Sequence, residues 1–155
     1  MTPTLDGVHH LKFPASDLPA AIDWFHNALG GTHLRALDHY DRDGTLFAVM
    51  ISLPGLPYPV ELRLDAKTAL GMAGYDPVTF SVADLAALED WVAHLDSAGV
   101  EHSPVLRGFA GHVIALSTPD GVAIRLYTAL PEDLSTIDMS PEHTDLDNPW
   151  VTGSH

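Results

Sequence analysis

The side chains of this sequence that could carry out chemistry are imidazoles and carboxylates. There are 10 histidines and 21 acidic residues but no cysteine, so disulfides, thiolate metal sites and cysteine nucleophiles are excluded. A neutral imidazole can act as a general base or a metal ligand near physiological pH. His143 lies among Glu142, Asp145 and Asp147, and we interpret this group as the charge run of a solvated tail rather than a metal site. The sequence has no HExxH pair, Gly-rich phosphate loop or nucleophile elbow.

Composition bounds the class of protein. The 155 residues, 46% of them hydrophobic, suffice for one domain or two half-domains with a shared core. The net charge of -14 argues against nucleic acid and anionic membranes as partners, and favours solubility or a cationic ligand. No apolar run reaches the roughly 20 residues of a membrane span, and the N-terminus does not resemble a signal peptide. We therefore expect a cytoplasmic protein with no membrane partner.

An internal repeat organises the elements that must position any site. Residues 10–25 align without gaps with residues 77–92, and six of the sixteen positions are identical. The identical pairs are Phe13/Phe80, Asp17/Asp84, Leu18/Leu85, Ala20/Ala87, Asp23/Asp90 and Trp24/Trp91. Each copy reads as a short apolar strand, an Asp that caps a helix N-terminus, and an amphipathic helix. Gly30-Gly31 and Gly99 end the two helices.

Strand patterns follow each helix. In the first copy they cover residues 32–40, 45–53 and 59–64, with a turn at 41–44. In the second copy they cover 102–106, 112–117 and 122–127, with a turn at 118–121. The order β-α-β-β-β therefore occurs twice, which predicts an α+β protein. We assign a first module to residues 1–65, a linker to 66–76, a second module to 77–128 and a tail to 129–155.

The linker and the tail carry separate expectations. Leu70 and Met72 of the linker are expected to pack against the protein. The acidic tail is expected to follow an irregular path over the surface, or to be partly disordered, with its last few residues mobile. Trp150 could alternatively hold the tail in a groove.

Two segments of the sequence resemble a known family. Gly7-Val8-His9-His10-Leu11, followed by Ala15-Ser16-Asp17-Leu18, is similar to the opening strand and helix cap of the vicinal oxygen chelate superfamily. This superfamily includes glyoxalases, bleomycin-resistance proteins and extradiol dioxygenases. The segment from Thr118-Pro119-Asp120-Gly121 to Tyr127 resembles the closing turn and strand. The resemblance covers roughly residues 6–128. It implies two half-open sheets around a shared cleft, and commonly a homodimer.

The resemblance also implies where a metal would bind in members that have one. The first module supplies His10 and Glu61 at such positions, whereas the second has Pro77 and Arg125, neither of which is a metal ligand. An Arg would repel a divalent ion. We therefore do not favour a metal cofactor. A site for Zn, Ni, Mn, Co or Fe made by His10, Glu61 and waters is the alternative.

The same family geometry makes His10, Glu61 and Arg125 the candidate catalytic residues of the cleft. Arg125 could replace the metal as the positive charge, either pairing with Glu61 or holding an anionic or carbonyl-bearing ligand. An internal ion pair with no chemistry is the alternative. His10 could be a general base, a hydrogen-bond donor to ligand, or a relic held by a backbone group. Lys12 and Arg63 share the strand parity of His10 and Glu61, so they are candidates to contact a ligand in the same cleft, and Arg107 could also face it.

Further residues are candidates to contact a ligand. Phe47, Met50, Tyr58, Phe109 and Tyr127 could supply apolar walls, and Thr79 is assigned to the same site. Phe109 lies in a loop that either closes over the cleft or is a loop tip. Trp24 and Trp91 are interpreted as packing residues.

Two functions remain open at this point. The first is a metal-independent binder of a cationic or aromatic small molecule, similar to bleomycin-resistance proteins. The second is a lyase, isomerase or dioxygenase-like enzyme of the same superfamily. Such an enzyme would use His10 and Glu61 with a divalent metal, or as acid and base with Arg125.

Overall fold

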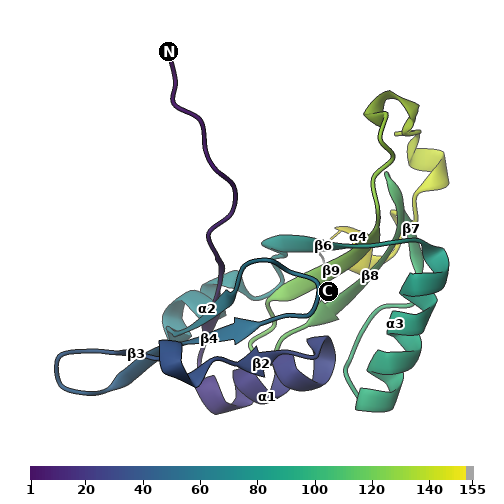
Figure 1. Ribbon diagram of the computed structural model, residues 1–155. Coiled ribbons are helices and arrows are strands. Elements are labelled where there is room, and N and C mark those ends of the chain that lie inside the picture. The colour runs from purple at the N-terminus through teal and green to yellow at the C-terminus, as the bar shows by residue number, and fades with distance from the viewer. Residues whose placement is uncertain (153–155) are drawn as a thin grey trace. The chain divides into compact units, whose positions relative to one another are not determined.

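The computed structural model describes residues 1–152, and its chain forms two compact units, Met1–Gly71 and a second that begins at Met72 (Figure 1). Each unit contains one mixed β-sheet and one long helix. The predicted α+β class with two β-α-β-β-β modules is therefore confirmed. No helix among residues 1–152 is long and apolar enough to cross a membrane.

Unit 1 is built around the first sheet. Its elements are β1 (Leu11–Ala15), α1 (Leu18–Leu29), β2 (Thr32–His33), η1 (Arg35–Leu37), β3 (His39–Tyr40), β4 (Leu46–Ser52) and β5 (Val60–Leu64). The strand order is β1-β5-β4-β2, and β3 also pairs with β4. The first strand runs parallel to the last, β5, while the other pairs are antiparallel.

Unit 2 repeats this topology after the short helix α2 (Ala66–Met72). Its elements are β6 (Val78–Val82), α3 (Leu85–Ala98), β7 (Leu106–Gly108), β8 (Gly111–Ser117) and β9 (Ala123–Thr128). The order β6-β9-β8-β7 again places the first strand parallel to the last. The repeat seen in the sequence is therefore a repeat of strand order as well as of helix caps.

The two long helices begin and end as the sequence predicts. The Asp17 carboxylate accepts a hydrogen bond from the Ala20 N–H at 3.0 Å, and Asp84 accepts one from Ala87 at 2.9 Å. These bonds satisfy donors that a helix N-terminus leaves unpaired. At the other ends, Gly30 and Gly99 adopt left-handed conformations with φ of 68° and 66°, which glycine reaches without steric cost.

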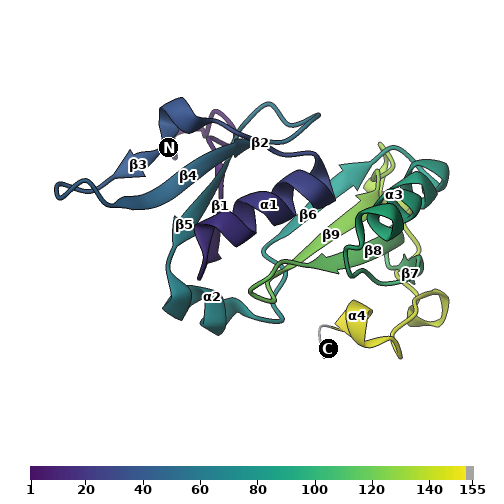
Figure 2. The same cartoon turned by 90° about the horizontal axis from the view of Figure 1, so that it is seen from below.

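Each sheet has one face covered by its helix. In unit 1 the Phe13 ring meets Phe25 of α1 at 5.4 Å, and Phe13 shares its sheet face with the buried Leu62. In unit 2 Phe80 and Leu126 occupy the equivalent register positions, and α3 contacts β8 and β9 (Figure 2). Because strand residues alternate between faces, Lys12, Glu61 and Arg63 lie on the helix-free face of unit 1. Thr79, Ser81, Arg125 and Tyr127 lie on that of unit 2.

Several predicted strand limits were wrong. Residues 32–40 are not one strand, because η1 separates the two-residue strands β2 and β3. Residues 102–106 do not form one strand either. His102 makes an isolated β-bridge, and β7 begins only at Leu106. Pro104 has no N–H to donate to a neighbouring strand. The Ala115 N–H donates a hydrogen bond to the Ser103 hydroxyl oxygen at 2.9 Å.

The segment between the sheets also differs from expectation. Residues 66–72 form α2, whose first turn is capped by Asp65 accepting from the Thr68 N–H at 2.9 Å. Leu70, which was expected to pack, is 79% exposed, and the buried residue of this helix is Ala69. Met72, the other residue expected to pack, is half-buried, so the linker does pack against the protein, through Ala69 and Met72 and not through Leu70.

Hydrogen bonds attach the tail to unit 2. It contains η2 (Leu134–Thr136), η3 (Pro141–His143) and α4 (Pro149–Thr152). Arg107 of β7 donates its N–H to the Asp145 carboxylate at 2.7 Å and accepts the Asp145 N–H at 2.9 Å. Further along, Arg125 donates to the Val151 carbonyl at 3.2 Å. The predicted mobility of the last few residues concerns positions 153–155, which lie outside the described residues.

Candidate functional site

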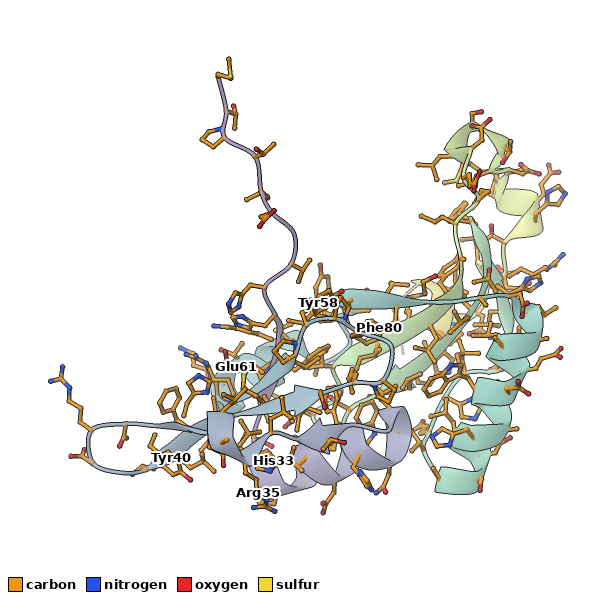
Figure 3. The ribbon with its side chains drawn as sticks, viewed as in Figure 1. His33, Arg35, Tyr40, Tyr58, Glu61 and Phe80 are labelled. Carbon is orange, nitrogen blue, oxygen red and sulfur yellow. The ribbon has the colours of Figure 1, made fainter. Side chains whose placement is uncertain are left out.

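Glu61 is the centre of a polar cluster on the helix-free face of unit 1 (Figure 3). It is 3% exposed, and a carboxylate this buried requires partners. Arg63, two residues along β5, supplies them through Nε at 2.7 Å and Nη2 at 2.6 Å, both to Oε1. The two side chains meet because residues i and i+2 of a strand project from the same face.

The other carboxylate oxygen of Glu61 faces the start of β1. Lys12 is the register partner of Glu61, and its Nζ lies 3.5 Å from Oε2. His10, which immediately precedes β1, places Nε2 at 3.3 Å from the same oxygen. Burial acts to raise the pKa of the Glu61 carboxyl, but the hydrogen bond and charge of Arg63 and the charge of Lys12 outweigh burial. The pKa therefore lies below its ordinary value.

Phe47 joins this cluster through an irregularity in β4. His39 pairs with Ala48 and Tyr40 with Leu46, so Phe47 is an extra residue on one side of the ladder. Such a bulge redirects a side chain, and the Phe47 ring lies 5.4 Å from the Arg63 guanidinium. We refer to His10, Lys12, Phe47, Glu61 and Arg63 as the Glu61 cluster. All five residues are among the candidates expected from the sequence.

His39 is a neighbour of the Glu61 cluster that the sequence analysis missed. Its ring contacts Phe47 at 5.8 Å between centroids, and its Nδ1 is buried without a hydrogen-bond partner. The strand pattern that ran through residues 32–40 gave no reason to single out this histidine. Its orientation depends on η1 and on the bulge, which alternation along one strand does not predict.

The residues present do not fit a divalent metal. Both oxygens of Glu61 face cations, since Arg63 holds Oε1 and Lys12 lies near Oε2, so a metal ion would have to displace positive charge. His10 and Glu61 are two ligands, whereas catalytic sites for metals such as zinc use three protein ligands. Within residues 1–152 no three His, Asp or Glu side chains come together as a metal site. His143 of the tail instead pairs with Asp138 at 2.5 Å.

Arg125, the third candidate catalytic residue, is paired inside unit 2. Its guanidinium forms an ion pair with Asp76 and donates to the Val151 carbonyl. Pairing with Glu61 was one of the alternatives expected for Arg125 from the sequence, and Asp76 was not among them. Asp76 lies three residues before Thr79, the register partner of Arg125, and this proximity follows from the strand pairing in the structure.

Unit 2 contains an apolar pocket of about 590 Å³, a volume typical of small-molecule sites. Thr79, Phe109 and Tyr127, all named as ligand-contacting candidates, lie in its wall. The other lining residues are Phe80, Ser81, Ala110, Thr128, Ala129, Leu130 and Met139. None of these ten side chains carries a charge, so the pocket suits an apolar or aromatic body with a few hydrogen-bonding groups.

The pocket depends on the turn between β7 and β8. Phe109 and Ala110 form the tip of this hairpin, and the Ala110 N–H donates to the Tyr127 hydroxyl at 3.3 Å. Gly108 has no side chain where the Tyr127 ring lies, and a Cβ there would overlap the Tyr127 hydroxyl. Phe109 thus lies at the tip of a hairpin, which was one of the two alternatives, and it also lines the unit 2 pocket.

The tail contributes to the same pocket. Leu130 and Met139 belong to it, and both were missed because the sequence analysis treated the tail as a surface segment. The backbone hydrogen bond from Arg107 lowers the pKa of Asp145 below its ordinary value and helps to fix the chain just beyond Met139. Arg107, named as a cleft candidate, therefore anchors the tail.

The comparisons agree with this geometry. The sequence model of the Glyoxalase/Bleomycin resistance protein/Dioxygenase superfamily matches residues 7–126. The chain belongs to this superfamily, as the resemblance implied. No curated protein sequence matches the chain significantly.

Solved structures of similar fold include resistance and antibiotic-binding proteins. A glyoxylase/bleomycin resistance protein/dioxygenase domain from Frankia sp. EAN1pec is 22% identical with a TM-score of 0.62, covering 81% of this chain and 99% of its own. TnmS3, an antibiotic binding protein from Streptomyces sp. CB03234, is 20% identical with a TM-score of 0.65, covering 82% and 98%. The fosfomycin resistance protein FosX from Listeria monocytogenes is 14% identical with a TM-score of 0.65, covering 84% and 99%. At these identities the likeness concerns the fold.

Proposed function

We propose that this protein binds an aromatic small molecule in the unit 2 pocket, without a metal. The observation that carries the proposal is the uncharged pocket of about 590 Å³, which has aromatic side chains in its wall. Similarity in fold to an antibiotic binding protein supports the same class of function. Because the net charge is -14, cationic aromatic molecules are favoured over anionic ones at long range. We also propose that the protein is a cytoplasmic homodimer, as expected from the sequence. Light scattering after size-exclusion chromatography measures its oligomeric state.

Binding of Nile red, a neutral aromatic dye, tests the pocket. We expect a saturable rise in dye fluorescence with the wild-type protein. Tyr127→Ala and Met139→Ala each remove a pocket wall, so we expect each to weaken dye binding about tenfold, equivalent to about 1.4 kcal/mol. Tyr75→Ala is the control, because Tyr75 is an exposed aromatic residue of the same unit outside the pocket. Equal dye affinity in all four proteins would overturn the assignment of the pocket.

Metal independence has its own test. We expect chelator-treated protein to bind Nile red as the untreated protein does, and its Tm to stay unchanged when Zn, Ni, Mn, Co or Fe(II) is added. A specifically bound metal at 100 times its Kd would add about 2.7 kcal/mol of stability. A rise in Tm that is present in the wild type and lost in Glu61→Ala would show that the metal-free proposal is wrong.

A further inference from the structure

The Glu61 cluster holds more positive charge than its one carboxylate neutralises. Lys12 and Arg63 both pair with Glu61, which leaves one net positive charge on this face of the sheet. Their side chains are 52% and 44% exposed, whereas Glu61 is buried. The two cations therefore extend from a buried anchor towards solvent. In a chain with seven basic and 21 acidic residues, the two cations and one carboxylate of the Glu61 cluster have a net charge opposite in sign to that of the whole protein.

Arg63 is held in a fixed orientation. Its Nε and Nη2 donate to Glu61, and its guanidinium lies over the Phe47 ring. A guanidinium has five N–H donors in a planar fork and can bind carboxylates along more than one edge. Glu61 takes the Nε–H and one N–H of Nη2. The second N–H of Nη2 and those of Nη1 form the terminal edge, which can receive a second carboxylate. Since Phe47 and Glu61 already restrict the side chain, less conformational entropy is lost on binding.

Among residues 1–152, the buried Nδ1 of His39 makes no hydrogen bond, and the His39 ring contacts Phe47 of the Glu61 cluster. Nε2 of His10 also makes no hydrogen bond, although Glu61 Oε2 lies 3.3 Å from it as an ion-pair partner. Buried polar atoms are nearly always hydrogen-bonded, so an unsatisfied one indicates a missing partner such as a ligand or water. Contacts through Glu61, Arg63 and Phe47 connect the two histidines.

We propose that the helix-free face of unit 1 binds a small organic carboxylate. Its two oxygens are received by the terminal edge of Arg63, and Lys12 provides the second positive charge. Phe47 supplies an apolar contact for the body of the molecule. At physiological ionic strength, salt screens the repulsion between the ligand and acidic residues that lie farther away than the Debye length of roughly 8 Å. The nearby Lys12 and Arg63 therefore determine the electrostatic attraction of the carboxylate. The residues of this site belong to unit 1, and the proposal goes beyond the function proposed for the unit 2 pocket.

Three isosteric probes of different charge test the site: benzoate, benzamide and benzamidine, which are anionic, neutral and cationic. Each is titrated into ¹⁵N-labelled protein while amide and arginine Nε–H signals are followed by NMR. We expect benzoate to shift the signals of Lys12, Phe47, Glu61 and Arg63 saturably, and its affinity to fall as salt is added. Benzamide and benzamidine are expected to bind at least tenfold more weakly at these residues.

Matched variants separate the local site from net charge. Arg63→Gln is expected to weaken benzoate binding at least tenfold, and Lys12→Gln about threefold because Lys12 is more exposed. Arg42→Gln, in an exposed turn, and Lys67→Gln, on α2, make the same charge changes elsewhere and are expected to change the affinity less than twofold. Arg63→Lys keeps the charge but loses the two-point contact, so its affinity should lie between those of the wild type and Arg63→Gln.

The proposal is overturned by any of three results. Benzamide could bind as well as benzoate, Arg63→Gln could bind benzoate as the wild type does, or all four Gln variants could lose affinity equally. The NMR spectrum of each variant shows whether it is folded, and Arg63→Lys provides a milder change if Arg63→Gln is not. Nile red binding by the unit 2 pocket is measured on the same samples. Failure of the carboxylate site is thereby distinguished from failure of the pocket.

Discussion

Gly108→Ala is expected to abolish high-affinity dye binding in the unit 2 pocket. A Cβ at Gly108 would lie 1.6 Å from the Tyr127 hydroxyl oxygen and 2.5 Å from the ring carbon that bears it. No relaxation of a few tenths of an ångström removes such an overlap, so the Tyr127 ring must rotate away. Rotation breaks the bond from the Ala110 N–H to the hydroxyl and removes an aromatic wall. We expect Nile red affinity to fall at least tenfold, and stability to fall by about 1–3 kcal/mol from overpacking.

The cause of this effect can be isolated with two further variants. In a Tyr127→Ala background the overlap no longer exists, so Gly108→Ala should add less than about 0.5 kcal/mol to the loss of stability. Gly71→Ala makes the same chemical change on α2, where a Cβ meets nothing within 4 Å, and should leave dye binding unchanged. Dye affinity is measured by fluorescence titration and stability by urea denaturation. Wild-type dye affinity in Gly108→Ala would show that Tyr127 does not form the pocket wall.

The features that the sequence predicts well depend on local periodicity. The repeated Asp17 and Asp84 were expected to cap helices, and both accept the predicted type of hydrogen bond. Lys12 and Arg63 were assigned to the face of Glu61 by strand parity, and both contact its carboxylate. Such inferences succeed because a strand of regular geometry alternates strictly, and a helix N-terminus leaves the same N–H groups unpaired in every case.

The features that the sequence does not predict depend on breaks in periodicity or on distant contacts. His39 reaches Phe47 only because a bulge in β4 interrupts alternation. Met139 lies in the pocket wall although it belongs to a tail with no repeating pattern. Arg125 pairs with Asp76, which is 49 residues away in sequence, and family geometry had directed attention to Glu61 instead. A second charge of the right sign nearby in space cannot be recognised from spacing along the chain.

Gly31→Ala is expected to destabilise unit 1 strongly, and the repeat supplies a control inside the same molecule. A Cβ at Gly31 would lie 2.7 Å from Cγ2 of the buried Ile51 and 3.0 Å from the backbone oxygen of Phe25. Because one of these neighbours is backbone at the end of α1, the clash cannot be relieved by a side-chain rotation alone. We expect a loss of about 2–3 kcal/mol, which corresponds to a Tm lower by roughly 5–10 °C for a chain of this size.

The equivalent residue after the second helix is Val100, which already carries a Cβ. Its N–H bonds to the Leu95 carbonyl, five residues back, whereas the Gly31 N–H bonds to Phe25, six residues back. The two helix ends therefore differ in their hydrogen-bond pattern, and a Cβ is present at Val100 whereas one at Gly31 would clash with Ile51 and Phe25. Val100→Ala should accordingly cost less than about 1.5 kcal/mol, the upper range for removing methyl groups from a partly buried Val. If urea denaturation gives Gly31→Ala the same stability as the wild type, the close approach of Ile51 and Phe25 to Gly31 is not what fixes this turn.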